Sequence, residues 1–277
     1  MDLKENKSDI KTILSHQADN GSELWTTVDN KLLKGAPFSA LESPLYLLEL
    51  GMKADDPLLE KSKQLIFDTW REDGRFKTAP KGAMYPCHTA LALRVLMNLG
   101  AKRDERCLKT IDFFINSQEK DGGWKCNKYS FGRGAETLYS TPMTTLTVLD
   151  CFRHLNISEY KETTDSAVEF LLNHWDIKRP IGPCHHGIGS LFHQVEYPFR
   201  GYNIFYYVYV LSFYPSAIKD HRFNEVLQVL EEKTVDGQIV VERVVPKLAK
   251  LNFCRKGEKS KSATARYNEL LTNVSKY

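Results

Sequence analysis

The sequence predicts an all-α protein folded as an α/α toroid, a barrel of about five helical hairpins with an inner and an outer layer. The repeat is visible in a short acidic-glycine-aromatic segment. It reads REDGRFKT at 71–78 and EKDGGWKC at 119–126, and a weaker copy reads TVDGQIVV at 234–241. The first two copies place Asp73 and Asp121 at a separation of 48 residues (121 − 73). A period of this length accommodates two helices and their turns, which is typical of stacked α-hairpins.

The predicted helices are of two kinds. Apolar residues occupy almost every position of three segments, which predicts inner helices buried on all sides: 87–99, 141–154 and 203–213. Four segments have one apolar and one polar face, which predicts outer helices: 57–70, 104–118, 162–174 and 220–233. In the second of these, the apolar stripe is expected from Leu108, Ile111, Phe114 and Ile115. A last inner helix is predicted at 262–274.

The N-terminal part of the chain supplies the first predicted hairpin. Segment 22–34 is predicted as an outer helix that carries Trp25 on an exposed surface, and 39–50 is predicted as the inner helix that follows it. Residues 1–20 have little periodicity. We therefore expect a loosely attached arm at 1–20 and a single toroid domain at 21–277.

Composition excludes several classes of protein. The chain has 277 residues and a formal net charge of +3, which is too small to indicate nucleic acid or a membrane surface as a partner. The sequence contains no run of about 18 apolar residues, which is the length that would predict a membrane-spanning helix. The N-terminal sequence MDLKENKSDI has no apolar core of a signal peptide, and the six cysteines are expected to be reduced. We expect a cytoplasmic protein.

The segment FFINSQEKDGGW at 113–124 resembles the QW motif of terpene cyclases, which is related to the repeats of protein prenyltransferase β subunits. The resemblance implies that Gln118 at the end of an outer helix ties to the Gly-Gly-Trp turn that follows. Trp124 would then cover the gap between neighbouring hairpins, because it is the largest apolar side chain available. The Asp73 copy is partial and the Asp236 copy is eroded.

The catalytic signatures of the two families are not reproduced. The acidic D-x-D-D segment of terpene cyclases is missing, and Asp55-Asp56 lies in a predicted link between helices. Prenyltransferase β subunits carry an Asp-x-Cys pair of zinc ligands, whereas Asp150-Cys151 lacks the spacer and suits a buried helix. Those subunits also act with a partner α subunit. If this chain is an enzyme, the resemblance implies a transferase or cyclase that acts on a prenyl diphosphate or related isoprenoid.

Cysteine and histidine recur on links that lead from an outer helix to the next inner helix. The predicted zinc ligands are Cys87, Cys126, Cys184 and His185. The last two lie in the long connection 175–201, and connections beyond about 12–15 residues are often functional. In a toroid these links share one rim, which would bring the four residues together. Two alternatives are that the thiols only pack as small apolar groups, or that Cys87 is a nucleophile with His185 or His186 as its base.

A central cavity is the second predicted site. Aromatic walls suit isoprenoid chains, through apolar burial and cation–π attraction. The residues expected to line it are His88, Tyr202, Phe205, Tyr206 and Tyr209. The alternative is that these rings fill the middle of a narrow barrel. Arg133, Lys259 and Lys261 are predicted to bind phosphate near a helix N-terminus, and the alternative for them is a solvated basic loop.

The sequence therefore leaves two functions open. The first is a prenyltransferase-like or terpene-cyclase-like protein that binds or transforms an isoprenoid-like ligand, with zinc as an expected cofactor. The second is a non-catalytic toroid of α-hairpins whose surface binds a protein partner.

Overall fold

The computed structural model describes residues 5–277 and is mainly helical. Its chain divides into two compact units. Unit 1 contains the chain up to Phe113 together with Val245–Phe253, and unit 2 contains Phe114–Val244 and Cys254–Tyr277. The prediction of a mainly α-helical protein is confirmed.

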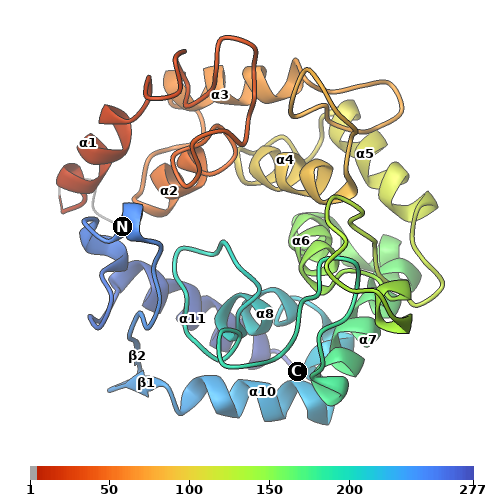
Figure 1. Cartoon of the computed structure of the whole chain (residues 1–277). Coiled ribbons are helices and arrows are strands. Elements are labelled where there is room, and N and C mark those ends of the chain that lie inside the picture. The colour runs from red at the N-terminus through yellow and green to blue at the C-terminus, as the bar shows by residue number, and fades with distance from the viewer. Residues whose placement is uncertain (1–4) are drawn as a thin grey trace. The chain divides into compact units, whose positions relative to one another are not determined.

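Unit 1 is built from four helices and the first part of a fifth. They are α1 (Lys7–Ser15), α2 (Ser43–Glu49), α3 (Pro57–Phe67), α4 (Pro86–Asn98) and α5 (Glu105–Asn116), which crosses the boundary after Phe113. A short 3₁₀ segment, η3 (Pro246–Leu248), also belongs to this unit. Helices α2 and α4 pack side by side, and α3 packs on α4 (Figure 1). Both α3 and α4 begin with proline, whose missing N–H would have no partner in the first turn anyway.

The N-terminal stretch of unit 1 differs from its prediction. Segment 22–34 forms turns rather than a helix, and Leu24, Trp25 and Asn30 have positive φ, which a right-handed helix does not allow. The expectation that Trp25 is exposed is wrong, because its side chain is 0% exposed and its Nε1 donates to the carbonyl of Ile13 (3.0 Å). The indole is buried against α1, which the sequence pattern did not predict.

Helix α1 lies within the stretch predicted as an N-terminal arm, of which residues 1–4 are outside the described part. Ile13 is buried, and the buried carboxylate of Asp9 accepts the backbone N–H groups of Asn252 (3.0 Å) and Phe253 (2.8 Å). Asn6 donates from Nδ2 to the carbonyl of Leu50 (3.0 Å). Residues 5–15 are therefore tied to unit 1 by buried and polar contacts.

Unit 2 is built from six helices and one short hairpin. The helices are α6 (Pro142–Phe152), α7 (Lys161–Ile177), α8 (Ile204–Leu211), α9 (Pro215–Ile218), α10 (His221–Glu231) and α11 (Lys261–Val274). Strands β1 (Thr234–Val235) and β2 (Gln238–Ile239) pair antiparallel, and short 3₁₀ segments lie at η1 (Ala135–Leu138), η2 (Ile157–Tyr160) and η4 (Asn252–Cys254), which begins in unit 1. Helices α6, α8 and α11 form one layer, and α7 and α10 pack over α6 and α8 (Figure 1).

The two layers of unit 2 match the two kinds of sequence segment. All eight residues of α8 are buried, as are all residues of α6 except Met143, so these apolar helices are surrounded by protein. Helix α10 buries one stripe, formed by Phe223, Val226, Leu227 and Leu230. In α5 the buried stripe lies on a slightly different side of the helix from the predicted one. Cys107 and Thr110 are buried, whereas Leu108, which is predicted to be in the stripe, is 37% exposed.

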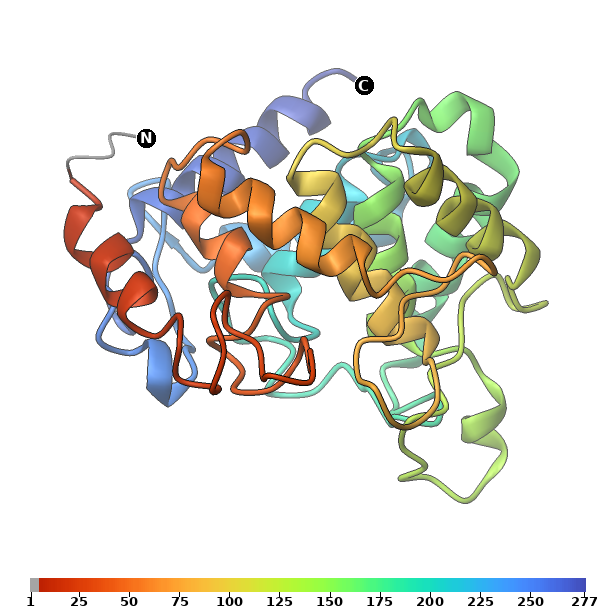
Figure 2. The same cartoon turned by 90° about the horizontal axis from the view of Figure 1, so that it is seen from above.

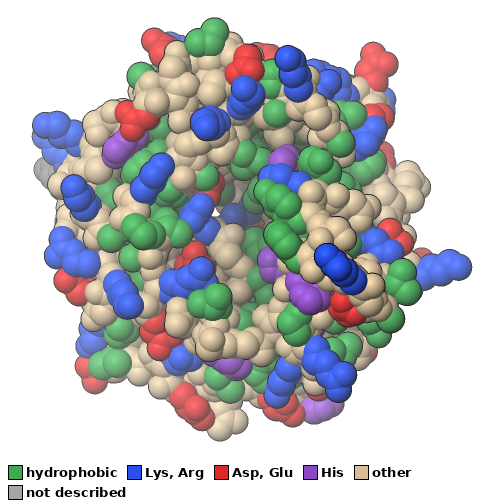
Figure 3. Space-filling view, viewed as in Figure 1, with side chains coloured by type: hydrophobic (Ala, Val, Ile, Leu, Met, Phe, Trp, Pro, Cys, Tyr) green, Lys and Arg blue, Asp and Glu red, His purple; other side chains and the backbone are tan. Residues whose placement is uncertain are grey.

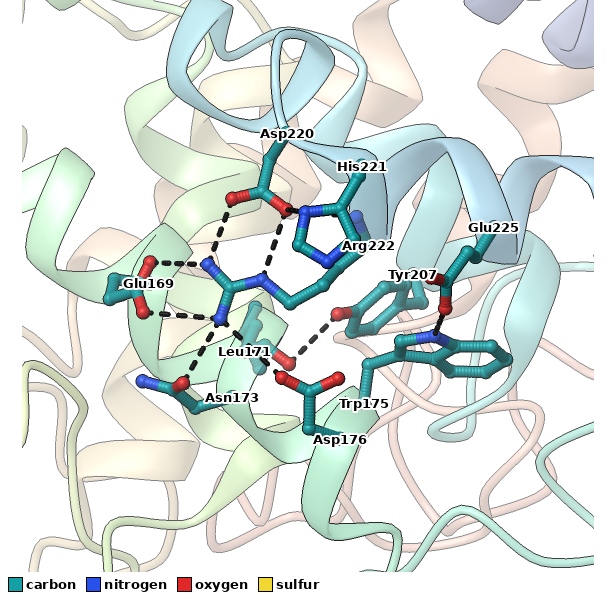
Figure 4. Close-up of polar contacts among 10 residues, drawn as sticks. All are labelled: Glu169, Leu171, Asn173, Trp175, Asp176, Tyr207, Asp220, His221, Arg222 and Glu225. Carbon is teal, nitrogen blue, oxygen red and sulfur yellow. Dashed lines mark hydrogen bonds and ion pairs between the residues drawn. The ribbon is translucent and has the colours of Figure 1, made fainter.

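One arginine joins the two covering helices, α7 and α10, to each other. Arg222 of α10 reaches α7, where its guanidinium donates to Glu169 (2.7 Å) and Asn173 (3.0 Å), and it also bonds Asp220 (2.8 Å), which precedes its own helix (Figure 4). The pKa of Arg222 is raised, mainly by its hydrogen bonds to Asp220 and next by those to Glu169. Beneath it, the hydroxyl of Tyr207 donates to the carbonyl of Leu171 (2.8 Å).

The three acidic-glycine-aromatic copies share one hydrogen bond. In each copy, the backbone N–H of the residue after the turn donates to a threonine Oγ1 in the first turn of the following helix. The pairs are Phe76 to Thr89 of α4 (3.3 Å), Trp124 to Thr145 of α6 (3.1 Å) and Ile239 to Thr264 of α11 (3.0 Å). Each threonine is the fourth residue of its helix, and each of the three donor residues is buried. The eroded third copy is therefore structurally equivalent to the first two.

Gln118 makes the tie that the sequence predicts. Its Nε2 donates to the carbonyl of Gly122 in the turn (2.7 Å) and to the carbonyl of Thr163 in α7 (2.8 Å). The same position in the first copy is Trp70 (118 − 70 = 48), whose Nε1 donates to Thr110 of α5 (3.3 Å). Both side chains link the end of one amphipathic helix to the next.

The turn glycines supply a sharp test of this geometry. Gly122 (φ +88°) and Gly237 (φ +69°) occupy the same position of two copies. A Cβ at Gly122 would lie 2.3 Å from the carbonyl oxygen of Ser166 in α7, whereas nothing lies within 4 Å of one at Gly237. Gly237→Ala should cost about 1–2 kcal/mol through its left-handed backbone alone. Gly122→Ala should cost a further 1–3 kcal/mol, roughly, through steric overlap.

Chemical unfolding of the two variants checks this prediction. Equal losses of unfolding free energy would show that the turn of the second copy does not abut α7.

Candidate functional site

Two long links of unit 2 meet beside the N-terminal ends of α6 and α8. The link 127–139 joins the second turn to α6, and 178–203 joins α7 to α8. The backbone N–H of Phe131 donates to the carbonyl of Pro183 (3.0 Å), and that of Gly182 donates to the carbonyl of Glu136 (2.9 Å). Figure 2 shows the first link projecting from the helices of unit 2. We call these two segments the paired links.

Two of the predicted zinc ligands are in contact: Cys184 in the second of the paired links, and Cys126, which directly precedes the first. The thiol of Cys184 donates to the carbonyl oxygen of Cys126 (3.4 Å), and Cys126 is buried. The pKa of Cys184 is raised to about 11, mainly by burial and to a smaller extent by the nearby Cys126. His185 turns instead toward Glu136, with its Nε2 3.4 Å from the carboxylate. The contacts in unit 2 are thus those of a protonated thiol and a histidine–carboxylate pair.

The fourth predicted ligand, Cys87, lies near the start of α4 in unit 1. Among residues 5–277, no group of three or more His, Cys, Asp or Glu side chains is arranged to hold a metal ion. Cysteine binds zinc as the thiolate, so a metal at Cys184 would have to displace the thiol proton. The four-residue zinc site stays a prediction from the sequence.

The aromatic residues predicted to line a cavity are packed against protein. Tyr206 is 0% exposed and Tyr209 is 2% exposed, and Phe205 and Tyr202 are also buried. Phe199 of the long link stacks on Tyr206 and Tyr209, with ring centroids 5.0 and 4.9 Å apart. The fifth predicted residue, His88, lies in unit 1, where its Nδ1 is 2.9 Å from Oγ1 of Thr78.

The hydroxyl groups of α8 enter a buried network of charged side chains. Tyr206 donates to the carboxylate of Asp150 in α6 (2.7 Å), and the guanidinium of Arg153 bonds the other oxygen of Asp150. Tyr209 donates to Glu269 in α11 (2.9 Å). This network ties the three helices of one layer to each other.

Arg153 is the centre of this network. Its guanidinium lies 5.3 Å from the ring centroid of Tyr209 and 4.8 Å from that of Phe213. Burial alone would lower its pKa, but the attraction of Asp150 outweighs burial and the pKa of Arg153 is raised. The faces of these rings thus already hold a cation. Sequence reasoning missed this residue, although the spacing of Asp150 and Arg153 (i, i+3) on an otherwise apolar helix was a usable signal.

A second polar cluster lies where the long link meets α7. Nδ1 of His174 is 2.8 Å from the hydroxyl of Tyr202, and its Nε2 is 3.1 Å from the carbonyl of Arg179. The ring of His186 meets that of Tyr202 edge to face, with centroids 5.8 Å apart. Burial lowers the pKa of both His174 and His186 to about 4, so both imidazoles are neutral at physiological pH.

The residues predicted to bind phosphate lie in two segments of unit 2. Lys259 is ion-paired with Asp236 (2.7 Å), and Lys261 is the first residue of α11. Ser260 caps that helix by accepting the N–H of Ala263 (3.1 Å). Arg133 lies exposed in the projecting link. Basic and acidic side chains are interspersed over the face drawn in Figure 3.

Comparisons with known proteins do not assign the chain. No known protein family matches the sequence, and no curated protein is similar enough to count as a relative. Within residues 5–277, none of the helices has the length and apolar character that crossing a membrane requires.

Paired tyrosines of α8 test the importance of the charged network. Tyr206 bonds a buried carboxylate, whereas Tyr207 bonds a backbone carbonyl. Hydrogen bonds to charged groups contribute about 1.5–3 kcal/mol, and neutral ones about 0.5–1.5 kcal/mol. Tyr206→Phe should therefore lower the free energy of unfolding more than Tyr207→Phe, as measured by urea titration. A larger loss of unfolding free energy for Tyr207→Phe would mean that the hydrogen bond from Tyr206 does not stabilise the buried carboxylate of Asp150.

The buried histidines make stability depend on pH. Their pKa is about 4 in the folded protein and about 6.5 when unfolded, so below pH 6.5 the unfolded chain binds protons that the folded chain does not. Their contribution is fully present above pH 6.5. Between pH 6.5 and 4, unfolding free energy should fall by up to about 1.4 kcal/mol per pH unit for each histidine.

Unfolding curves at several pH values measure this loss. His186→Gln should flatten the dependence, and His221→Gln, whose side chain is exposed, should not. A wild-type profile identical to that of His186→Gln would contradict the prediction.

Proposed function

We propose that the chain is an α/α toroid of the QW-repeat class, with about five hairpins in an inner and an outer layer. We propose further that it binds or transforms an isoprenoid-like ligand in a central cavity, as prenyltransferase-like and terpene-cyclase-like proteins do. The observation that carries the proposal is the threefold recurrence of the turn whose N–H bonds the fourth residue of the next helix. It supports a repeating hairpin, and the Gln118 tie supports the resemblance to the QW motif.

The proposed ligand follows from the side chains of unit 2. Helix α8 brings five aromatic rings, counting Phe205, Tyr206, Tyr207 and Tyr209 with the adjoining Phe213, to one layer. The orientation of Tyr206 and Tyr209 is fixed by hydroxyl bonds to Asp150 and Glu269, and that of Tyr207 by its bond to the carbonyl of Leu171. An aromatic layer suits a hydrocarbon chain, which would have to displace Phe199 from the faces of Tyr206 and Tyr209.

A diphosphate group would be held by the segment that enters α11. Lys259 and Lys261 flank the helix N-terminus, where backbone N–H groups and the helix dipole favour an anion. The partner of Lys259, Asp236, is exposed, so a phosphate can replace it at small cost. Arg133 lies in the projecting link 127–139 and is not part of this proposed contact.

Proton donation is a less suitable chemistry for this network. Both oxygens of Asp150 already accept hydrogen bonds, from Arg153 and Tyr206, and the adjacent guanidinium favours the charged carboxylate. We therefore propose ligand binding or diphosphate-based transfer in preference to cyclisation initiated by a protonated aspartate.

A second function is favoured by two observations. The rings of α8 are almost completely buried, and the projecting link exposes large apolar side chains: Tyr129, Phe131, Leu138 and Tyr139. Phe131 is 66% exposed and Leu138 is 71% exposed. Apolar groups that gather on one exposed segment are typical of protein-binding surfaces. The second candidate is therefore a non-catalytic module that binds a protein partner through this link.

Thermal unfolding with farnesyl diphosphate and farnesol separates the two functions. A ligand at 100 times its Kd raises the free energy of unfolding by about 2.7 kcal/mol, and we expect both compounds to raise Tm. The double variant Lys259→Gln/Lys261→Gln should bind farnesyl diphosphate about tenfold more weakly, through loss of about 1.4 kcal/mol, and farnesol unchanged.

Lys256→Gln, in the same basic segment, is the matched control and should behave as wild type. If neither compound changes Tm up to its solubility limit, isoprenoid binding is excluded and the protein-binding function is supported.

A further inference from the structure

A pocket of about 560 Å³ opens in unit 2 at the C-terminal ends of α6 and α8. Its wall includes residues that directly follow these two helices, Leu155 and Phe213, together with the start of α7. The volume lies within the range of sites that bind small molecules, which is about 300–1,000 Å³. In the same unit, Cys126, Cys184, His185 and the paired links lie at the opposite, N-terminal ends of α6 and α8.

The pocket has an apolar wall. Four apolar side chains line it and are only partly covered by protein: Leu155, Ile157, Phe213 and Pro215. The ring of Tyr277 lies at its edge, with the ammonium of Lys219 5.5 Å from the ring centroid. An apolar group of a ligand would remove these partly exposed side chains from water.

One polar group in the wall lacks a partner. The Oγ atom of Ser216 is buried and has no hydrogen-bond partner within the described residues 5–277. Buried hydroxyl groups are normally bonded, and an exception calls for an explanation such as a ligand. The other polar groups of the wall are engaged: Asn156 bonds Glu159 and Ser158, and Lys161 pairs with Asp165.

The charges of the wall define the ligand further. Lys161, Lys219 and Asp165 sum to +1, because the carboxylate balances one of the two ammonium groups. Lys219 is exposed and contacts only the face of a ring among the interactions described for it. The exposed ammonium of Lys219 can donate to an anion in the pocket, and the buried hydroxyl of Ser216 can donate to the same anion after its side chain rotates toward the pocket. A single negative charge would neutralise the wall.

We propose that this pocket binds a small apolar monocarboxylate, with its carboxylate between Ser216 and Lys219 and its tail on Leu155, Ile157 and Phe213. This pocket shares Phe213 with the aromatic layer proposed to bind the isoprenoid. Its carboxylate contacts, Ser216 and Lys219, belong to neither that layer nor the lysines near α11, so either proposal can fail without the other.

Calorimetric titration of the full chain with monomeric decanoate tests the proposal, with 1-decanol as the uncharged probe. Decanoate should bind with 1:1 stoichiometry and more tightly than decanol. Lys219→Gln should weaken decanoate about tenfold and leave decanol unchanged, since a charge-assisted hydrogen bond is lost. Lys102→Gln, an exposed lysine in unit 1, should bind both probes as wild type does.

The variant Ser216→Ala distinguishes a role of this hydroxyl in ligand binding from a role in stability. The hydroxyl has no partner in the free protein, so its removal should leave Tm unchanged or raised while decanoate binding weakens about tenfold. Absence of decanoate binding, equal binding of decanoate and decanol, or wild-type binding by Lys219→Gln would each overturn the proposal.

Discussion

The hydrogen bond from a turn N–H to a helix threonine is the constraint on which the repeat depends. It joins residues separated by 13 positions in the first copy, 21 in the second and 25 in the third. The length of the link therefore varies while its two ends stay in the same geometry. A glycine with positive φ redirects the chain, and the next buried side chain then lies against the following helix. Additional residues between these ends, such as 127–139, can acquire other roles without disturbing the helices.

The buried charges of unit 2 serve a different purpose from the turns. Removing Asp150 and Arg153 from water is costly, and their attraction offsets that cost only because Tyr206 and the adjacent rings supply further contacts. A purely apolar interface between α6, α8 and α11 would tolerate several alternative packings. Directional bonds from Tyr206 to Asp150 and from Tyr209 to Glu269 favour one of them. The same bonds fix Tyr206 and Tyr209, two of the rings for which we propose an isoprenoid-like ligand.

The helices α6 and α8 have chemically different surroundings at their two ends. At their N-terminal ends lie the paired links, with the neutral imidazole of His186, a protonated thiol and exposed apolar side chains. At their C-terminal ends lies a pocket with a net positive wall and an unbonded serine hydroxyl. Loops and helix ends are free to vary in this way because the apolar packing of the helices carries the stability.

The sequence by itself determined most of the helices, their two kinds and the positions of the three turns, because periodicity and glycine conformation act over a few residues. It did not determine α1 or the turns at 22–34. It predicted α4, α6, α8, α10 and α11 within a few residues, and it predicted the Gln118 tie. Tertiary structure alone decided that Trp25 is buried, that His185 faces Glu136, and that Asp150 bonds Tyr206. These partners are distant in sequence, up to 56 residues apart for the last pair, so packing selects them and no local pattern records the choice.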